Sequence, residues 1–249
     1  MQNPSNSPIE WRANPQGLLQ PYSTIFQDVY YSSDNGLLET DYVFLQGNQL
    51  AQRWQPLLSK HFTIIETGFG TGLNFLCAAQ LWLKIAPPTA TLHFISAEKY
   101  PLTLAEITAA WQAWPELNQV CQPFLAQYEA STKHSIQLFD NRVHLSLLIG
   151  DATDCLSKTA TTADAWFLDG FSPAKNPEMW QPALFADMAR LSKSGTTFAT
   201  FTSAGLVRRG LQSAGFEVNK QAGFGKKREM LIGRFVGKSF ISESKISDN

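Results

Sequence analysis

The stretch ETGFGTGLN, residues 66–74, decides the fold of this chain. It follows FTIIE, an apolar run typical of a buried strand, and it leads into TGLNFLCAAQLWLKI, whose apolar spacing predicts a helix that two consecutive prolines end. The glycines Gly68, Gly70 and Gly72 permit a tight turn and let a ligand come close to the backbone. A strand, a glycine loop and a helix in this order predict the ligand-binding start of an α/β domain.

Strands and helices alternate along the rest of the chain. The apolar runs that predict further strands lie at residues 91–98, 143–151, 165–169 and 196–202. Helical periodicity lies at residues 102–114, 177–192 and 204–215, while residues 135–140 and 216–235 have the pattern of antiparallel pairs. This alternation predicts an α/β fold with a doubly wound, mostly parallel sheet and an antiparallel edge hairpin, in which ligands bind at the carboxyl ends of the strands.

We divide the chain into three parts. Residues 1–60 are predicted to be an N-terminal extension, irregular over its first ~20 residues. It continues with a β-hairpin that turns at SDNG, residues 33–36, and with a helix over residues 48–58. Residues 61–236 form the ligand-binding domain, and the polar residues 237–249 form a flexible tail.

Composition and charge narrow the class of protein. An apolar content of 44%, a charged content of 16% and a net charge of −1 indicate a globular protein and argue against a polybasic nucleic-acid binder. The three cysteines and four histidines lack the spacing of a zinc site, so we expect no metal. No apolar run approaches the ~20 residues of a membrane helix, and the first residues are no signal peptide, so we expect a cytoplasmic protein without membrane contact.

Acidic residues at the predicted strand ends favour a cationic ligand over a dinucleotide. Leu73 stands where the dinucleotide fingerprint needs its last glycine, and Glu66 before the loop would repel a pyrophosphate. S-adenosyl-L-methionine has no phosphate and carries a sulfonium and an ammonium. Glu98 could take its ribose hydroxyls and Asp151 its adenine amino group. Acids also end strands for structural reasons alone, and an NAD(P)-dependent oxidoreductase is the rival on a similar fold.

The stretch DAWFLDGFSPAKNPEMW, residues 164–180, is the candidate for the reacting group. Class I methyltransferases carry a functional motif after their fourth strand, where Asp169 stands here. Asp169 could take a proton from an amine or hold that amine by a hydrogen bond, and Phe171 could stack on a base. Pro173 and Pro177 restrict the loop. The alternative is that Asp169 caps the following turn and Phe171 covers core.

Five segments together resemble the methyltransferase domain of the bifunctional MnmC tRNA-modification proteins and their stand-alone relatives, MnmD. They are FQDVYYS, GLLETDYVFLQGNQLAQRW, ETGFGTGLNFL, DAWFLDGFSPAKNPEMW and FGKKREML, and the likeness runs over residues 11–235. The resemblance implies a Rossmann-like class I enzyme that uses S-adenosyl-L-methionine to methylate the amine of 5-aminomethyl(-2-thio)uridine at the wobble position of tRNA. The product would be 5-methylaminomethyl(-2-thio)uridine.

The resemblance also implies a set of site residues, with Asp169 facing the amine. The donor site would comprise Glu66, Gly68, Gly70, Gly72, Asn74, Glu98, Lys99 and Asp151. The substrate site would comprise Tyr31, Phe171, Pro173, Lys175, Lys226, Lys227 and Arg228. The last three are basic and could contact phosphates of the anticodon loop, although such residues are as often solvated surface charges.

Two departures from the family pattern bear on function. The bifunctional proteins contain an FAD-dependent oxidase domain that exposes the amine, but this chain has no second glycine fingerprint, so we expect no FAD here and an oxidase that is fused or separate. Thr67 stands where the family leads us to expect a more apolar residue. The alternatives are a methyltransferase for a small-molecule amine and a donor-binding fold that serves only to bind RNA.

Overall fold

The computed structural model describes residues 9–14, 17, 19–31, 35–128 and 135–237. Its main sheet has eight strands in the order β10-β11-β9-β8-β4-β5-β7-β6. Their bounds are β4 (His61–Thr67), β5 (Thr91–Glu98), β6 (Ser135–Leu138), β7 (Val143–Ile149), β8 (Ala163–Leu168), β9 (Ser192–Thr200), β10 (Phe216–Ala222) and β11 (Glu229–Phe235). The pairs among β4, β5, β7, β8 and β9 are parallel, and β6, β10 and β11 pair antiparallel. The predicted α/β class with a mostly parallel sheet is confirmed.

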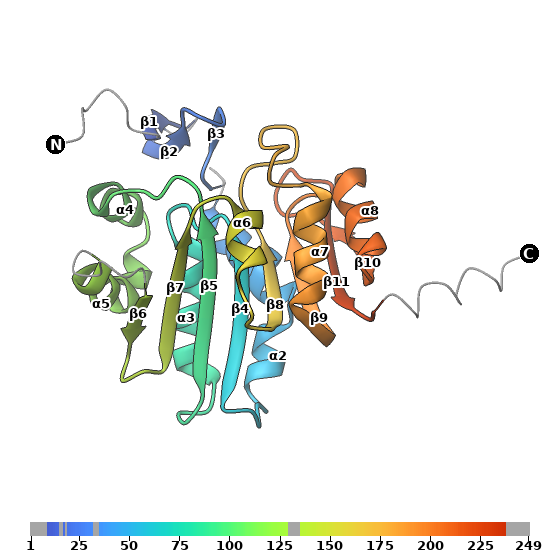
Figure 1. Ribbon diagram of the computed structural model, residues 1–249. Helices are drawn as coiled ribbons and strands as arrows, with labels where there is room; N and C mark the ends of the chain where they lie inside the picture. The colour runs from blue at the N-terminus through green and yellow to red at the C-terminus, as the bar shows by residue number, and fades with distance from the viewer. Residues whose placement is uncertain (1–8, 15–16, 18, 32–34, 129–134, 238–249) are drawn as a thin grey trace, which may run out of the picture.

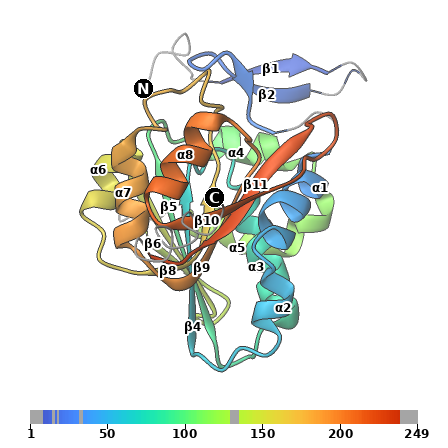
Figure 2. The same cartoon turned by 90° about the vertical axis from the view of Figure 1, so that its right-hand side faces the viewer.

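Helices cover both faces of this sheet (Figure 2). On one face α3 (Leu73–Ile85), α4 (Leu104–Trp111) and α5 (Asn118–Tyr128) enclose an apolar core with β4, β5 and β7. On the other face α6 (Ala152–Ser157), α7 (Pro182–Arg190) and α8 (Gly205–Ser213) enclose a second core. The strands β4, β5 and β8 are therefore buried between the two layers of helices, which fixes the positions of their carboxyl ends.

The N-terminal segment differs from its prediction in two places. The first ~20 residues were expected to be irregular, but they contain β1 (Ile9–Ala13), which begins a three-stranded antiparallel sheet with β2 (Leu19–Ser23) and β3 (Asp28–Val29). The hairpin expected at residues 33–36 is wrong, because Asn35 instead caps α1 (Gly36–Thr40) by accepting the Leu38 N–H at 3.0 Å. An Asn-Gly pair serves a helix start as well as a turn. Ser33 and Asp34 lie outside the described residues.

The chain continues from α1 into η2 (Asp41–Gln46), a π-helix, and α2 (Leu50–Trp54), the latter within the predicted helix. Val43, Phe44, Leu50 and Trp54 are buried in the same core as α3. The three-stranded sheet, in contrast, lies above the carboxyl ends of the parallel strands (Figure 1). The helices of the segment before β4 thus pack into the core, and its strands form a roof, meaning a layer over the carboxyl ends of the parallel strands. Residues 238–249 of the predicted tail lie outside the described residues.

Besides α1 and η2, which stand where the hairpin was expected, the helices α5 and α6 were not predicted, and their apolar pattern is weak. The α5 sequence NQVCQPFLAQY is polar and contains Pro123, and η3 (Pro115–Leu117) precedes it as a short 3-10 helix. The α6 helix spans six residues, too few for a periodic signal. Within the described part of the chain, no helix is long and apolar enough to span a membrane.

Candidate active site

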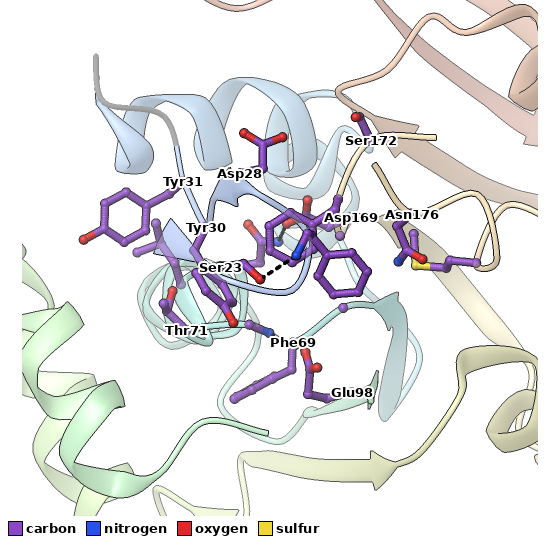
Figure 3. A pocket seen from close by; sticks show the side chains of 18 of the residues that line it. Ser23, Asp28, Tyr30, Tyr31, Phe69, Thr71, Glu98, Asp169, Ser172 and Asn176 are labelled. Atoms are coloured by element: carbon purple, nitrogen blue, oxygen red, sulfur yellow. Dashed lines mark hydrogen bonds between the residues drawn. The ribbon is translucent and has the colours of Figure 1, made fainter. Parts of the chain in front are cut away.

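A cavity of about 410 Å³ opens at the carboxyl ends of β4, β5, β7 and β8, under the three-stranded sheet. Tyr30, Glu98 and Asp169 belong to different segments and surround this space (Figure 3). The predicted residues that line it are Tyr31, Gly68, Gly70, Asn74, Glu98, Lys99, Asp151, Asp169, Phe171 and Lys227. The predicted residues that do not line it are Glu66, Gly72, Pro173, Lys175, Lys226 and Arg228.

The glycine loop forms the floor of the cavity with backbone atoms. Gly68 has φ +81°, and a Cβ on it would lie 2.9 Å from the Cα of Gly170, so two loops touch here without side chains. Gly70 has φ +53°, and a Cβ there would lie 3.2 Å from the ring of Tyr30. Side chains at these positions would be strained and would close the space between the loop and its cover.

Glu98 holds the glycine loop from the end of β5. Its Oε2 accepts the N–H of Gly70 at 2.8 Å, and its Oε1 accepts the N–H of Tyr100 at 2.7 Å. Burial raises the pKa of Glu98, and these backbone donors oppose the rise because they stabilise the charged form. The carboxylate lines the cavity and keeps acceptor capacity for hydroxyl groups of a ligand.

Asp151 and Lys99 meet at the rim of the cavity, after β7 and β5. Asp151 Oδ1 accepts the N–H of Thr153 at 3.0 Å and so caps α6. Lys99 Nζ lies 3.6 Å from Asp151 Oδ2 and 3.2 Å from Glu178 Oε2. These exposed ion pairs add little stability, but they hold the Lys99 ammonium beside the cavity.

At the cavity wall, Asn74 bridges two carboxylates. Its Nδ2 donates to Glu66 Oε1 at 2.9 Å and to Asp169 Oδ2 at 2.6 Å, while its Oδ1 accepts from Thr40 Oγ1 at 2.9 Å. Glu66 is fully buried, and its Oε2 accepts from Ser96 Oγ at 2.6 Å. Glu66 does not line the cavity itself and is linked to it by the hydrogen bond from Asn74. Burial holds the pKa of Glu66 well above the usual range.

Asp169 follows β8 and lines the cavity opposite the glycine loop. Burial raises the pKa of its carboxyl to about 7, although hydrogen bonds from Gly170 N–H and Asn74 lower it. Its backbone carbonyl accepts from Thr67 Oγ1 at 2.9 Å. The hydroxyl of Thr67, where we expected an apolar residue, thus ties the end of β4 to the residue after β8. A carboxylate with a pKa near neutrality can take a proton from an amine at physiological pH.

Aromatic side chains cover the cavity, and one of them, Phe26, was not assigned from the sequence. Phe171 stacks on Phe26, with ring centroids 4.4 Å apart and an interplanar angle of 22°. Tyr30 meets Phe171 edge-on at 5.4 Å. Phe26 and Tyr30 belong to the N-terminal segment, and a single sequence does not show which distant residues they contact. The signal available in the sequence was the repeated aromatic residues of FQDVYYS. The cover joins the N-terminal segment around β3 to the loop that follows β8.

The basic residues of the β10–β11 turn separate into two kinds. Lys227 Nζ lies 2.6 Å from Glu39 Oε1 and 4.3 Å from the ring centroid of Phe201, at the cavity wall. Lys226 and Arg228 are exposed outside the cavity. Lys175 is also outside, where its Nζ donates to the carbonyl of Gln27 at 3.2 Å and joins its loop to the N-terminal segment. Pro173, in the same loop, is half-buried.

Comparison with known proteins gives three concordant results. A family model for S-adenosyl-L-methionine-dependent methyltransferases matches residues 115–235. The chain is 54% identical over 234 residues to the tRNA 5-methylaminomethyl-2-thiouridine biosynthesis bifunctional protein MnmC of Methylobacillus flagellatus, and 51% identical over 232 residues to that of Pseudomonas paraeruginosa. The crystal structure of MNMC2 from Aquifex aeolicus has a TM-score of 0.72 at 21% identity, covering 97% of this chain and 77% of that one.

The coverage of these relatives is unequal. The alignments span 93% and 92% of this chain but 35% of each MnmC protein. The chain therefore spans about a third of the length of the curated relatives it matches. The matched part includes the glycine loop, the loop of Asp169 and the last hairpin.

Proposed function

The chain belongs to the MnmC family of S-adenosyl-L-methionine-dependent methyltransferases, and we propose that it methylates the amine of 5-aminomethyl(-2-thio)uridine at the tRNA wobble position. It has the Rossmann-like fold of class I methyltransferases, and S-adenosyl-L-methionine is its methyl donor. The observation that carries the proposal is one cavity that holds both a glycine loop and Asp169, a carboxylate with a pKa of about 7. The product is 5-methylaminomethyl(-2-thio)uridine.

The donor fits the side of the cavity formed by β4, β5 and β7. We place its ribose hydroxyls on Glu98 and its adenine amino group on Asp151, with the backbone of Gly68 and Gly70 along its amino-acid part. The acids present suit the chemistry of a ligand that carries a sulfonium and an ammonium and no phosphate. Gly72 lies outside the lining and shapes the loop, with φ +76°.

The reaction needs a neutral amine aligned with the methyl group. Bound S-adenosyl-L-methionine supplies an electrophilic methyl on its sulfonium. Asp169 would accept a hydrogen bond from the substrate ammonium and then its proton, which leaves the nitrogen lone pair free to attack the methyl carbon while the carbon–sulfur bond breaks and its electron pair stays on sulfur, leaving a neutral thioether. Alignment can supply up to ~7–11 kcal/mol of the barrier, whereas proton transfer typically contributes about 10²–10⁴-fold. We therefore assign Asp169 an orienting role at least as large as its role as a base.

The rate of methyl transfer should depend on pH through Asp169. Burial raises the pKa of this carboxyl to about 7, so below that pH the base is protonated and cannot take the amine proton. We expect kcat to fall about tenfold per pH unit on the acid side and to level off above neutrality. Single-turnover transfer to tRNA at a series of pH values measures this limb. A flat profile across neutrality contradicts the role of Asp169 as a base.

For tRNA binding, we propose that Lys226 and Arg228 contact phosphates, because both are exposed beside the cavity wall formed by Lys227. Changing Lys226 and Arg228 together to Ala should weaken tRNA binding and lower the slope of log K against log salt by about 0.7–0.9 per lost contact. The matched control is Lys60→Ala with Lys84→Ala, an equal charge change at the opposite end of β4 and α3, where both residues are exposed. Equal effects of the two pairs would show that only total charge matters.

The test of the function is transfer from labelled S-adenosyl-L-methionine to tRNA that carries the aminomethyl wobble uridine, followed by nucleoside mass analysis. A gain of one methyl on that nucleoside is the expected result. Absence of transfer while the donor still binds would favour the other candidate, a methyltransferase for a small-molecule amine.

The substrate chemistry implies a preceding step. Because the relatives are bifunctional, we further propose that an FAD-dependent oxidase, fused or separate, exposes the amine in the tRNA anticodon loop. The place of action would then be the cytoplasm, where tRNA is modified and where the free cysteines Cys77, Cys121 and Cys155 would stay reduced.

A further inference from the structure

Asn74 lies between the glycine loop, which we assign to the donor, and Asp169, which we assign to the substrate amine. It lies in the first turn of α3, directly after the glycine loop, and it is 6% exposed. All three hydrogen bonds that fix its side chain go to other segments: to Glu66 on β4, to Asp169 after β8 and from Thr40 on α1. A side chain fixed from three directions has one orientation and cannot follow an independent movement of either loop.

The bond to Asp169 is the shortest of the three, at 2.6 Å from Nδ2 to Oδ2. It fixes one oxygen of the carboxylate, and Asp169 lines the cavity in which the amine would bind. The Thr40 hydroxyl occupies the amide oxygen of Asn74, so both N–H groups must point to the two carboxylates. The direction in which Asp169 points is therefore set by Asn74 together with the N–H of Gly170 and, one step further, by Thr40.

We propose that Asn74 is the positioning residue of the methyl transfer: it aims the Asp169 carboxylate at the substrate amine and couples that carboxylate to the glycine loop. This inference rests on the proposed function, and it assigns to Asn74 a role toward the substrate in addition to its place among the donor-site residues. The buried Glu66 accepts the second N–H of the Asn74 amide and so prevents that amide from rotating.

The hydrogen bond from Asn74 also affects the protonation state of the Asp169 carboxyl group. An N–H donated to a carboxylate stabilises its ionised form, and the hydrogen bond from Asn74 lowers the pKa of Asp169 against the rise caused by burial. Without the bridge, Asp169 loses both its direction and part of the stabilisation of its anion. Loss of direction lowers kcat at every pH, whereas loss of stabilisation moves the acid limb of kcat to higher pH.

The experiment compares the wild-type chain with Asn74→Leu, which fills the same space without polar atoms, and with Thr40→Val, which removes only the bond to the Asn74 oxygen. For Asn74→Leu we expect kcat to fall by at least ~10-fold with the acid limb displaced upward. For Thr40→Val we expect smaller changes of the same sign. Because Asn74 also belongs to the donor-site residues, donor affinity is measured by calorimetry and kcat is compared at saturating S-adenosyl-L-methionine.

The matched control is Asn48→Leu. Asn48 is also a fully buried asparagine with three hydrogen bonds, to Phe44 O, to Trp166 O and from Thr197 Oγ1, but it does not line the cavity. Its replacement should lower thermal stability and leave the acid limb where it is. If Asn74→Leu and Thr40→Val lower stability and rate but leave the limb unmoved, as Asn48→Leu does, Asn74 is only structural and the proposal is overturned.

A readout without substrate separates this inference from the proposed function. The carboxyl ¹³C resonance of Asp169, identified by its loss in Asp169→Asn, should titrate at higher pH in Asn74→Leu and in Thr40→Val than in the wild type. If the resonance shifts but the wild type does not methylate tRNA, the function fails and the positioning role stands. If tRNA is methylated and the titration is the same in all three chains, the positioning role fails and the function stands.

Discussion

Asp169→Asn is expected to lower the rate of methyl transfer by about 10²–10⁴-fold, the range typical of a lost general base. Asparagine keeps the size of the side chain and an oxygen that can still accept from Asn74, so the cavity should keep its shape. It cannot take a proton from the amine. The affinity for S-adenosyl-L-methionine should change less than about threefold, because we assign Asp169 to the substrate amine and not to the donor. Labelled methyl transfer and donor calorimetry on the same preparation measure both quantities.

The control for this variant is Asp164→Asn, five positions earlier in β8. Asp164 accepts the N–H of Thr63 at 2.8 Å and pairs with Lys193 at 2.6 Å, and it does not line the cavity. That variant should lose some stability and keep its turnover. Equal losses of turnover and donor affinity in Asp169→Asn would assign Asp169 to the framework of the cavity.

Glu98→Ala should weaken the binding of S-adenosyl-L-methionine by about 100-fold. The substitution removes the acceptor of two backbone N–H groups, those of Gly70 and Tyr100, as well as the carboxylate that we assign to the ribose. A buried donor left without a partner costs about 1–3 kcal/mol, so the glycine loop would also lose its fixed position. Calorimetric titration with the donor measures the change in affinity.

Glu178→Ala is the matched control for the donor site. Glu178 is an acid near the same rim, where it pairs with Lys99 at 3.2 Å, but its side chain is 77% exposed and outside the cavity. Its removal should leave donor affinity unchanged within about threefold. A Glu98→Ala chain that binds the donor as tightly as the wild type would remove Glu98 from the donor site.

The positions that the sequence could predict share one physical property. Gly68, Glu98, Asp151 and Asp169 lie at the ends of predicted strands of a parallel sheet, whose carboxyl ends meet along one edge. The strand runs were apolar and sharply bounded, so the residues at their ends could be placed without any knowledge of side-chain contacts. That the structure brings these four to one cavity follows from topology alone.

The residues that could not be predicted depend on contacts between distant segments. Phe26 stacks on Phe171, and Glu39 on α1 pairs with Lys227 in the turn of the last hairpin. Neither pairing has a periodic or local signal in the sequence. Lys227 was expected to contact phosphates of the tRNA, but it lies at the cavity wall. Asn35 shows the local limit, because the same Asn-Gly pair suits a hairpin turn and a helix cap.

The aromatic cover has a consequence for folding. Phe26 and Tyr30 come from the beginning of the chain, and Phe171 from its second half, yet they close over the same cavity. A donor bound beneath them, as we propose, would contact both and would hold together regions that are far apart in the sequence. Unfolding of either region would then cost the binding energy of the donor, which ties the melting of the roof to the melting of the sheet below.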